Sequence, residues 1–120
     1  MLFKVKEVTG VVVIELIGRY GEPGEPPLVD LFEAKLSEGN RLFLINLAGL
    51  KFINSFGLGT LLRAYIKVKE AGGQLKMCGA EPRVRHFFKV ITDEHLFDVS
   101  LDCEEELKQL LEYSPDGNGE

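Results

Sequence analysis

The chain has 120 residues, of which 45% are hydrophobic and 28% are charged, and its formal net charge at pH 7 is −5. This length and composition fit one soluble globular domain with a single core. The acidic balance argues against a nucleic-acid or anionic-membrane surface, because phosphate binding needs clustered lysine and arginine. We interpret the single basic cluster, at Arg83, Arg85, His86 and Lys89, as a solvated helix face.

The sequence predicts neither a membrane span nor a metal site. No apolar run approaches the ~20 residues that cross a bilayer, and the N-terminus alternates like a strand, so we expect a cytoplasmic protein. Cys78 and Cys103 stand far apart, whereas a zinc site needs four ligands in close pairs. The simplest interpretation is two reduced thiols, although a bridge between them stays open. We expect no cofactor.

The N-terminal part of the chain predicts a β-hairpin. Residues 3–8 and 11–17 are rich in β-branched residues and flank the turn Thr9-Gly10. The second run is apolar at successive positions, which predicts a central strand covered on both faces and ended by Gly18. Residues 19–27 are rich in glycine and proline, so we expect an exposed loop.

Apolar spacing then predicts helices alternating with core strands. The expected elements are a helix at 28–37, a buried strand at 41–47, a helix from the region of Ser55 to Gly72-Gly73, a strand at 74–78, a helix from Pro82, an edge strand at 96–101 and a final helix capped by Asp102. This order predicts an α/β sandwich with a mixed sheet of four to five strands and about four helices. We assign residues 1–112 to the domain and 113–120 to a flexible tail.

The joint between the buried strand and the long helix carries two polar residues, Asn54 and Ser55. Both residue types are preferred helix caps, so one interpretation is that they only begin the helix. The other is functional, because the N-terminus of a helix is also a favourable place for an anion. Spacing alone favours the cap, and the anion site stays open as the alternative.

The same stretch resembles the STAS domain of bacterial anti-sigma factor antagonists and sulphate transporters. In the antagonists a strand is followed by an apolar pair, then Asp-Ser-Ser/Thr/Ala-Gly-Leu-Gly and a helix. Here the apolar pair is Phe52-Ile53, and the Gly-Leu-Gly stands intact at residues 57–59. The resemblance covers about residues 3–112 and includes the order of the elements.

The resemblance implies a non-enzymatic switch that acts through protein–protein contact in transcription regulation. The serine after the Asp position, here Ser55, would be phosphorylated by an anti-sigma factor kinase. The unphosphorylated form would bind that partner. The expected partner-binding residues are Asn54, Ser55, Phe56, Gly57, Leu58, Tyr20 and Gly21.

Three features depart from the family pattern. Asn54 replaces the usual Asp, Phe56 replaces a small or hydroxyl residue, and the loop at 19–27 is longer and richer in proline. These departures keep open a second function, a STAS scaffold or accessory subunit of a sensory or transport complex without a phosphorylation cycle. A nucleotide-binding role ranks last, since the Gly57-x-Gly59 pattern lacks the Lys-Ser/Thr pair of a phosphate loop.

Overall fold

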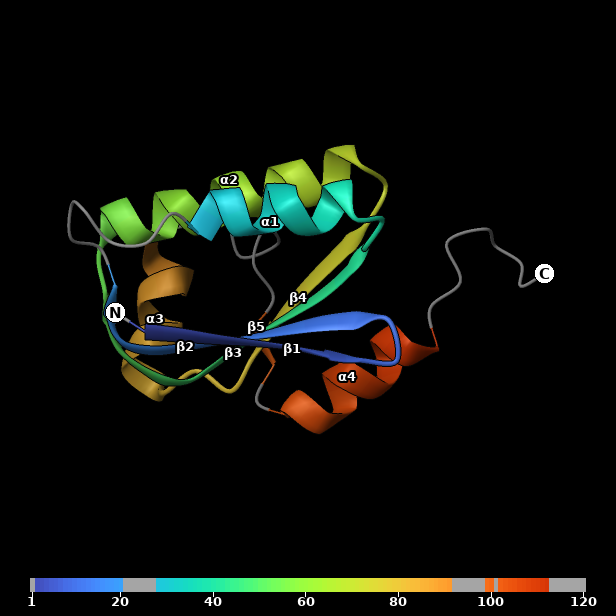
Figure 1. Ribbon diagram of the computed structural model, residues 1–120. Helices are drawn as coiled ribbons and strands as arrows, with labels where there is room; N and C mark the ends of the chain where they lie inside the picture. The colour runs from blue at the N-terminus through green and yellow to red at the C-terminus, as the bar shows by residue number, and fades with distance from the viewer. Residues whose placement is uncertain (1, 21–27, 92–98, 101, 113–120) are drawn as a thin grey trace.

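The fold is described by a computed structural model, which covers residues 2–20, 28–91, 99–100 and 102–112. Its elements alternate in the predicted α/β order (Figure 1). In chain order they are β1 Leu2–Val8, β2 Val11–Tyr20, α1 Leu28–Ser37, β3 Leu42–Ile53, α2 Ser55–Glu70, β4 Gln74–Cys78, α3 Pro82–Ile91, β5 Val99–Ser100 and α4 Cys103–Leu111.

The five strands form one mixed sheet in the order β1-β2-β3-β4-β5. β1 is antiparallel to β2, while the other neighbouring strands are parallel. The predicted hairpin is confirmed: Val8 pairs with Val11 across Thr9 and Gly10, which both have positive φ. Two such residues match the twist of a two-residue hairpin turn. β2 and β3 pair in parallel, so α1 between them forms a β–α–β crossover, in keeping with the predicted alternation of strands and helices.

β2 is the central strand that its sequence predicts. Val12 and Ile14 belong to the larger core cluster, whereas Val11 and Val13 belong to a smaller one on the opposite face. Figure 1 shows the layers: α1 and α2 cover one face of the sheet, α4 covers the other, and α3 stands at the end where α2 begins. Successive strand residues point to opposite faces, so a strand between two helical layers is apolar throughout.

Two strands run further than predicted. β2 does not end at Gly18 but continues to Tyr20, with an irregularity in its pairing at Gly18, where φ is +97°. β3 does not end at Leu47 but continues to Ile53. The two extensions pair with each other, and their backbone hydrogen bonds stabilise both. Both extensions lie outside the apolar runs from which the strands were predicted. This lengthening brings the end of β2 to the start of α2.

The simplest interpretation of the cysteines, two reduced thiols, was wrong, and the bridge that the sequence left open is formed. Cys78 at the end of β4 and Cys103 at the start of α4 form a disulfide, with sulfur atoms 2.10 Å apart. The two residues are separated by 25 positions in sequence, and a β–α–β crossover brings them together.

Asp102 caps α4 as predicted, since its Oδ1 accepts a hydrogen bond of 3.1 Å from the Glu105 N–H.

Some predictions fall outside the described residues, namely the loop at 21–27, most of the edge strand at 96–101 and the tail at 113–120. Of that edge strand, β5 is described and pairs with β4. Within the described residues, none of the helices has the length and apolarity to cross a bilayer. No cluster of three or more histidine, cysteine or acidic side chains suited to a metal is found within those same ranges.

Candidate functional site

The joint between β3 and α2 is capped by Asn54. Its backbone is extended, and its Oδ1 accepts a hydrogen bond of 3.0 Å from the Gly57 N–H. Its carbonyl oxygen accepts a second bond, of 2.9 Å, from the Leu58 N–H. An aspartate carboxylate would accept the same hydrogen bond, so the amide keeps the cap and removes only the negative charge. The capping role thus falls to Asn54 and not to Ser55.

Ser55 is the first residue of α2, and it is exposed. The next residue, Phe56, is 56% exposed, which is unusual for so large an apolar side chain. The first N–H groups of a helix have no intrahelical acceptors, and the macrodipole makes this end positive. The joint therefore presents an exposed hydroxyl and an exposed aromatic ring, on successive residues, at an electropositive helix end.

The following two residues lie beneath this surface. Leu58 is 4% exposed and belongs to the larger core cluster, and Gly57 is also buried. Leu58 therefore anchors the first turn of α2 from below, and its side chain is not available to a partner. Gly59 differs, because a Cβ built there would meet nothing within 4 Å. Packing inside the domain does not require a glycine at that position.

The end of β2 lies beside this joint. In the parallel ladder Arg19 is opposite Phe52, and Tyr20 is opposite Ile53, one residue before the cap. The Arg19 guanidinium carbon lies 4.2 Å from the centroid of the Phe52 ring. The structure thus brings the backbone of Tyr20 next to the predicted site, whereas Gly21 lies outside the described residues.

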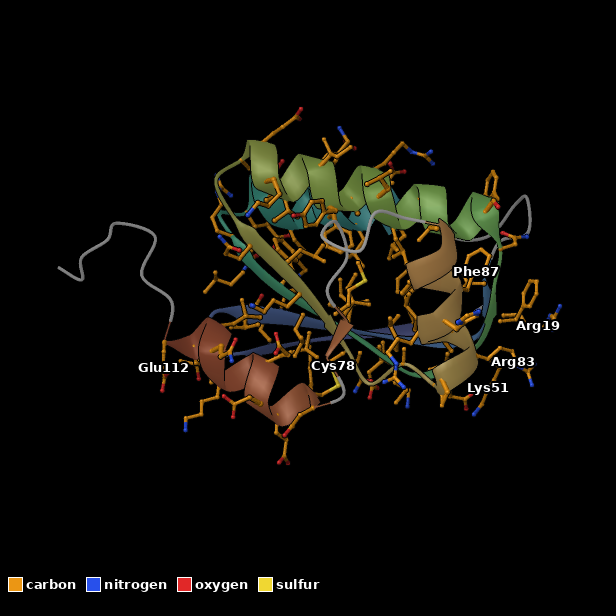
Figure 2. All side chains as sticks on the ribbon, turned by 180° about the vertical axis from the view of Figure 1, so that it is seen from behind. Arg19, Lys51, Cys78, Arg83, Phe87 and Glu112 are labelled. Atoms are coloured by element: carbon orange, nitrogen blue, oxygen red, sulfur yellow. A yellow bond between two sulfur atoms is a disulfide. The ribbon has the colours of Figure 1, made fainter. Side chains whose placement is uncertain are left out.

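A groove of about 270 Å³ opens between this joint and α3. Its lining comes from Lys51, Phe52, Ile53, Asn54, Ser55, Arg83, Val84 and Phe87. Figure 2 shows Lys51, Arg83 and Phe87 at the end of the molecule where α2 begins. Lys51 Nζ lies 2.6 Å from Glu81 Oε2. The sequence does not reveal this groove, because Val84 and Phe87 have the spacing of an ordinary core-facing side of a helix.

Comparison with known proteins identifies the family. The STAS domain family matches residues 3–106. A Bordetella bronchiseptica protein named as an anti-sigma factor antagonist, BtrV, is 24% identical over 100 residues, which cover 83% of this chain and 86% of BtrV. These matches extend over most of the chain, including the joint at Asn54 and Ser55.

Solved structures show the same fold. An anti-sigma factor antagonist from Mycobacterium paratuberculosis is 20% identical with a TM-score of 0.78, covering 91% of this chain and 92% of that one. Unphosphorylated SpoIIAA, an anti-sigma factor antagonist, is 20% identical with a TM-score of 0.70, covering 94% and 100%. The phosphorylated form of SpoIIAA from Bacillus has a TM-score of 0.71, with 18% identity over 91% and 99%. The chain belongs to the STAS domain family.

Proposed function

We propose that this protein is an anti-sigma factor antagonist of the cytoplasm, a non-enzymatic module that binds an anti-sigma factor with serine kinase activity and is switched by phosphorylation of Ser55. The observation that carries the proposal is the exposed Ser55 hydroxyl at the first position of α2, next to a cap that Asn54 already provides. A cap serine would be engaged with the helix backbone, whereas this serine is open to a kinase. The BtrV and SpoIIAA names support the class of partner.

The chemistry of the joint supports a switch. A phosphoserine carries about −1.5 to −2 charges at pH 7 and adds strong acceptor oxygens. At the positive end of α2 this charge is tolerated by the domain, since a helix N-terminus favours anions. A partner packed against the same surface would have to desolvate that charge, which costs it binding free energy. Phosphorylation therefore removes the partner without unfolding the domain.

The proposed contact surface is centred on the exposed side chains of Ser55 and Phe56, beside the half-buried Asn54. The family resemblance adds Tyr20, the last residue of β2, and Gly21. Exposed aromatic residues at the centre of a contact often supply much of the binding free energy, so Phe56 is the proposed anchor. Gly57 and Leu58 contribute by holding the first turn of α2 in place.

Incubation with the anti-sigma kinases of the same genome and Mg-ATP, followed by mass spectrometry of the digested protein, tests the proposal. The expected result is one phosphate, located at Ser55, and a complex that forms with the unphosphorylated protein only. Ser55→Ala should abolish the modification, while Ser37→Ala, which removes another exposed serine, should leave it unchanged. Absence of both phosphate and complex would refute the proposal.

Asn54 and Phe56 depart from the usual motif and favour one second candidate, a scaffold or accessory subunit of a sensory or transport complex. Affinity purification from the native host separates the two functions. Permease or sensor subunits that co-purify equally with the Ser55→Ala and Ser55→Asp variants would support the scaffold. A partner lost only with Ser55→Asp would support the switch.

A further inference from the structure

The groove beside Ser55 has the composition of a ligand site. Its base is formed by core side chains, since Ile53 is 5% and Val84 is 2% exposed. The half-buried Phe87 and the partly exposed Phe52 add two aromatic rings to its lining. Small-molecule sites are typically concave and mostly apolar, with a few polar groups that orient the ligand. An apolar group can therefore be withdrawn from water here without rearranging the domain.

The two charged side chains on the same lining are both cationic. Lys51 and Arg83 line the groove, and Arg19 lies on the ring of Phe52. Lys51 is held by Glu81 at 2.6 Å, whereas Arg83 has no carboxylate within ion-pair distance among the described residues. A guanidinium group can donate two parallel hydrogen bonds to one carboxylate. In a chain with a net charge of −5, Arg83 gives this groove a local positive charge.

The start of α2 adds to this preference. Its first turn contains no acidic residue, and neither does that of α3, whereas Asp30 lies in the first turn of α1 and three glutamates lie in that of α4. Acidic residues in a first turn offset the positive helix end. At α2, where Ser55 and Asn54 reach the groove, that positive end is left for an outside anion.

We propose that the groove binds a small organic acid, with its apolar body against Val84 and Phe87 and its carboxylate at Arg83. The volume of about 270 Å³ lies just below the usual range of sites for drug-sized ligands, which suits a single ring or a short branched chain. A nucleotide is larger and requires more phosphate donors than this lining offers. The inference goes beyond the proposed switch and requires no kinase.

The test is a titration of the ¹⁵N-labelled full chain, followed by amide chemical shifts. The probe is 3-phenylpropionate, compared with the uncharged 3-phenylpropionamide and with propionate, which lacks the ring. The acid should shift amides within residues 51–55 and 83–88, with a dissociation constant below about 10 mM. Each comparison compound should bind at least about fivefold more weakly than the acid, because it lacks one of the two recognised groups.

Two variants with the same charge change separate the site from general electrostatics. Arg83→Gln removes the proposed partner of the carboxylate and should lower the affinity for the acid at least about fivefold. Lys69→Gln removes an exposed cation at the far end of α2 and should leave the affinity unchanged. The amide spectrum of each variant reports whether the fold is intact.

Other outcomes overturn the inference. Shifts that are absent, that scatter over the surface, or that are equal for the acid and the amide would exclude an organic-acid site. So would an Arg83→Gln variant that binds like the parent protein. None of these results bears on phosphorylation of Ser55, which is tested with the kinase alone, so failure of one proposal is distinguishable from failure of the other.

Discussion

The Arg19 guanidinium stacks on the ring of Phe52, with 4.2 Å between the guanidinium carbon and the ring centroid. The two residues are also partners in the parallel ladder of β2 and β3. This contact joins the ends of two strands directly before the helix that carries Ser55. It ties the irregular end of β2 to the site.

Arg19→Gln should lower the free energy of unfolding by about 0.5–1 kcal/mol, because an exposed cation–π contact is worth that much. Urea denaturation monitored by circular dichroism measures the change. Lys6→Gln, which removes an exposed cation of β1 that lies opposite Val13 in the ladder, serves as the control and should have no measurable effect. Equal stability of the two variants would show that the stacking contributes nothing.

Asn54→Ala should destabilise the protein by roughly 0.5–2 kcal/mol, since the Gly57 N–H loses its side-chain acceptor. Asn54→Asp keeps the acceptor and adds a negative charge at the helix N-terminus, so it should stabilise the protein by roughly 0.3–1 kcal/mol at pH 7. Urea denaturation at low ionic strength compares the three proteins. A neutral effect of the alanine would contradict the capping role.

Gly59→Ala should raise the free energy of unfolding by about 0.5–1 kcal/mol, because a Cβ there meets nothing within 4 Å and alanine favours the helix. Gly73→Ala is the matched contrast. Its Cβ would come within van der Waals overlap of the Arg41 carbonyl oxygen, so that variant should be less stable than the parent protein. Thermal denaturation ranks the three. If Gly59→Ala also lowers the affinity for a protein partner, the glycine serves to let that partner approach the helix backbone closely.

Ser55→Asp should leave the free energy of unfolding within about 0.5 kcal/mol of the parent value, because the added charge lies at an exposed, positive helix end. Binding of an anti-sigma kinase should fall at least about tenfold, which corresponds to ~1.4 kcal/mol. Calorimetric titration measures the affinity. Unfolding of the variant would contradict a switch that acts at the surface.

Cys103→Ser should cost roughly 2–4 kcal/mol under oxidising conditions, because the bridge to Cys78 restricts the unfolded chain. With dithiothreitol present the parent protein should approach the stability of the variant. Denaturation with and without the reductant makes the comparison. A parent protein whose stability is unaffected by complete reduction would show that packing alone holds α4 in place.

The sequence predicted most of the fold because the apolar periods are strong. The helix at 28–37 and the strand at 74–78 match α1 and β4 residue for residue. The ends of β2 and β3 were missed, since Lys51 and Arg19 look like loop residues until the two strands are seen to pair. Strand pairing is a property of two segments, and neither one reveals it alone.

The sequence predicted only the part of the candidate site that lies at the joint between β3 and α2. Ser55 and Asn54 stand out as polar residues at a strand-to-helix joint. The contribution of α3 is hidden, because Val84 and Phe87 follow an ordinary helical period and Arg83 belongs to an ordinary basic face. The disulfide could not be predicted either, because residue spacing does not show that the end of β4 lies beside the start of α4.

Among the described strands, β1 lies at one edge of the sheet and pairs only with β2. No other described strand covers its outer backbone groups, and its Val5 side chain is 38% exposed. Lys4 and Lys6 flank that valine and are exposed. Because two such edges would bring lysines of like charge together, these side chains protect the molecule against strand-by-strand aggregation.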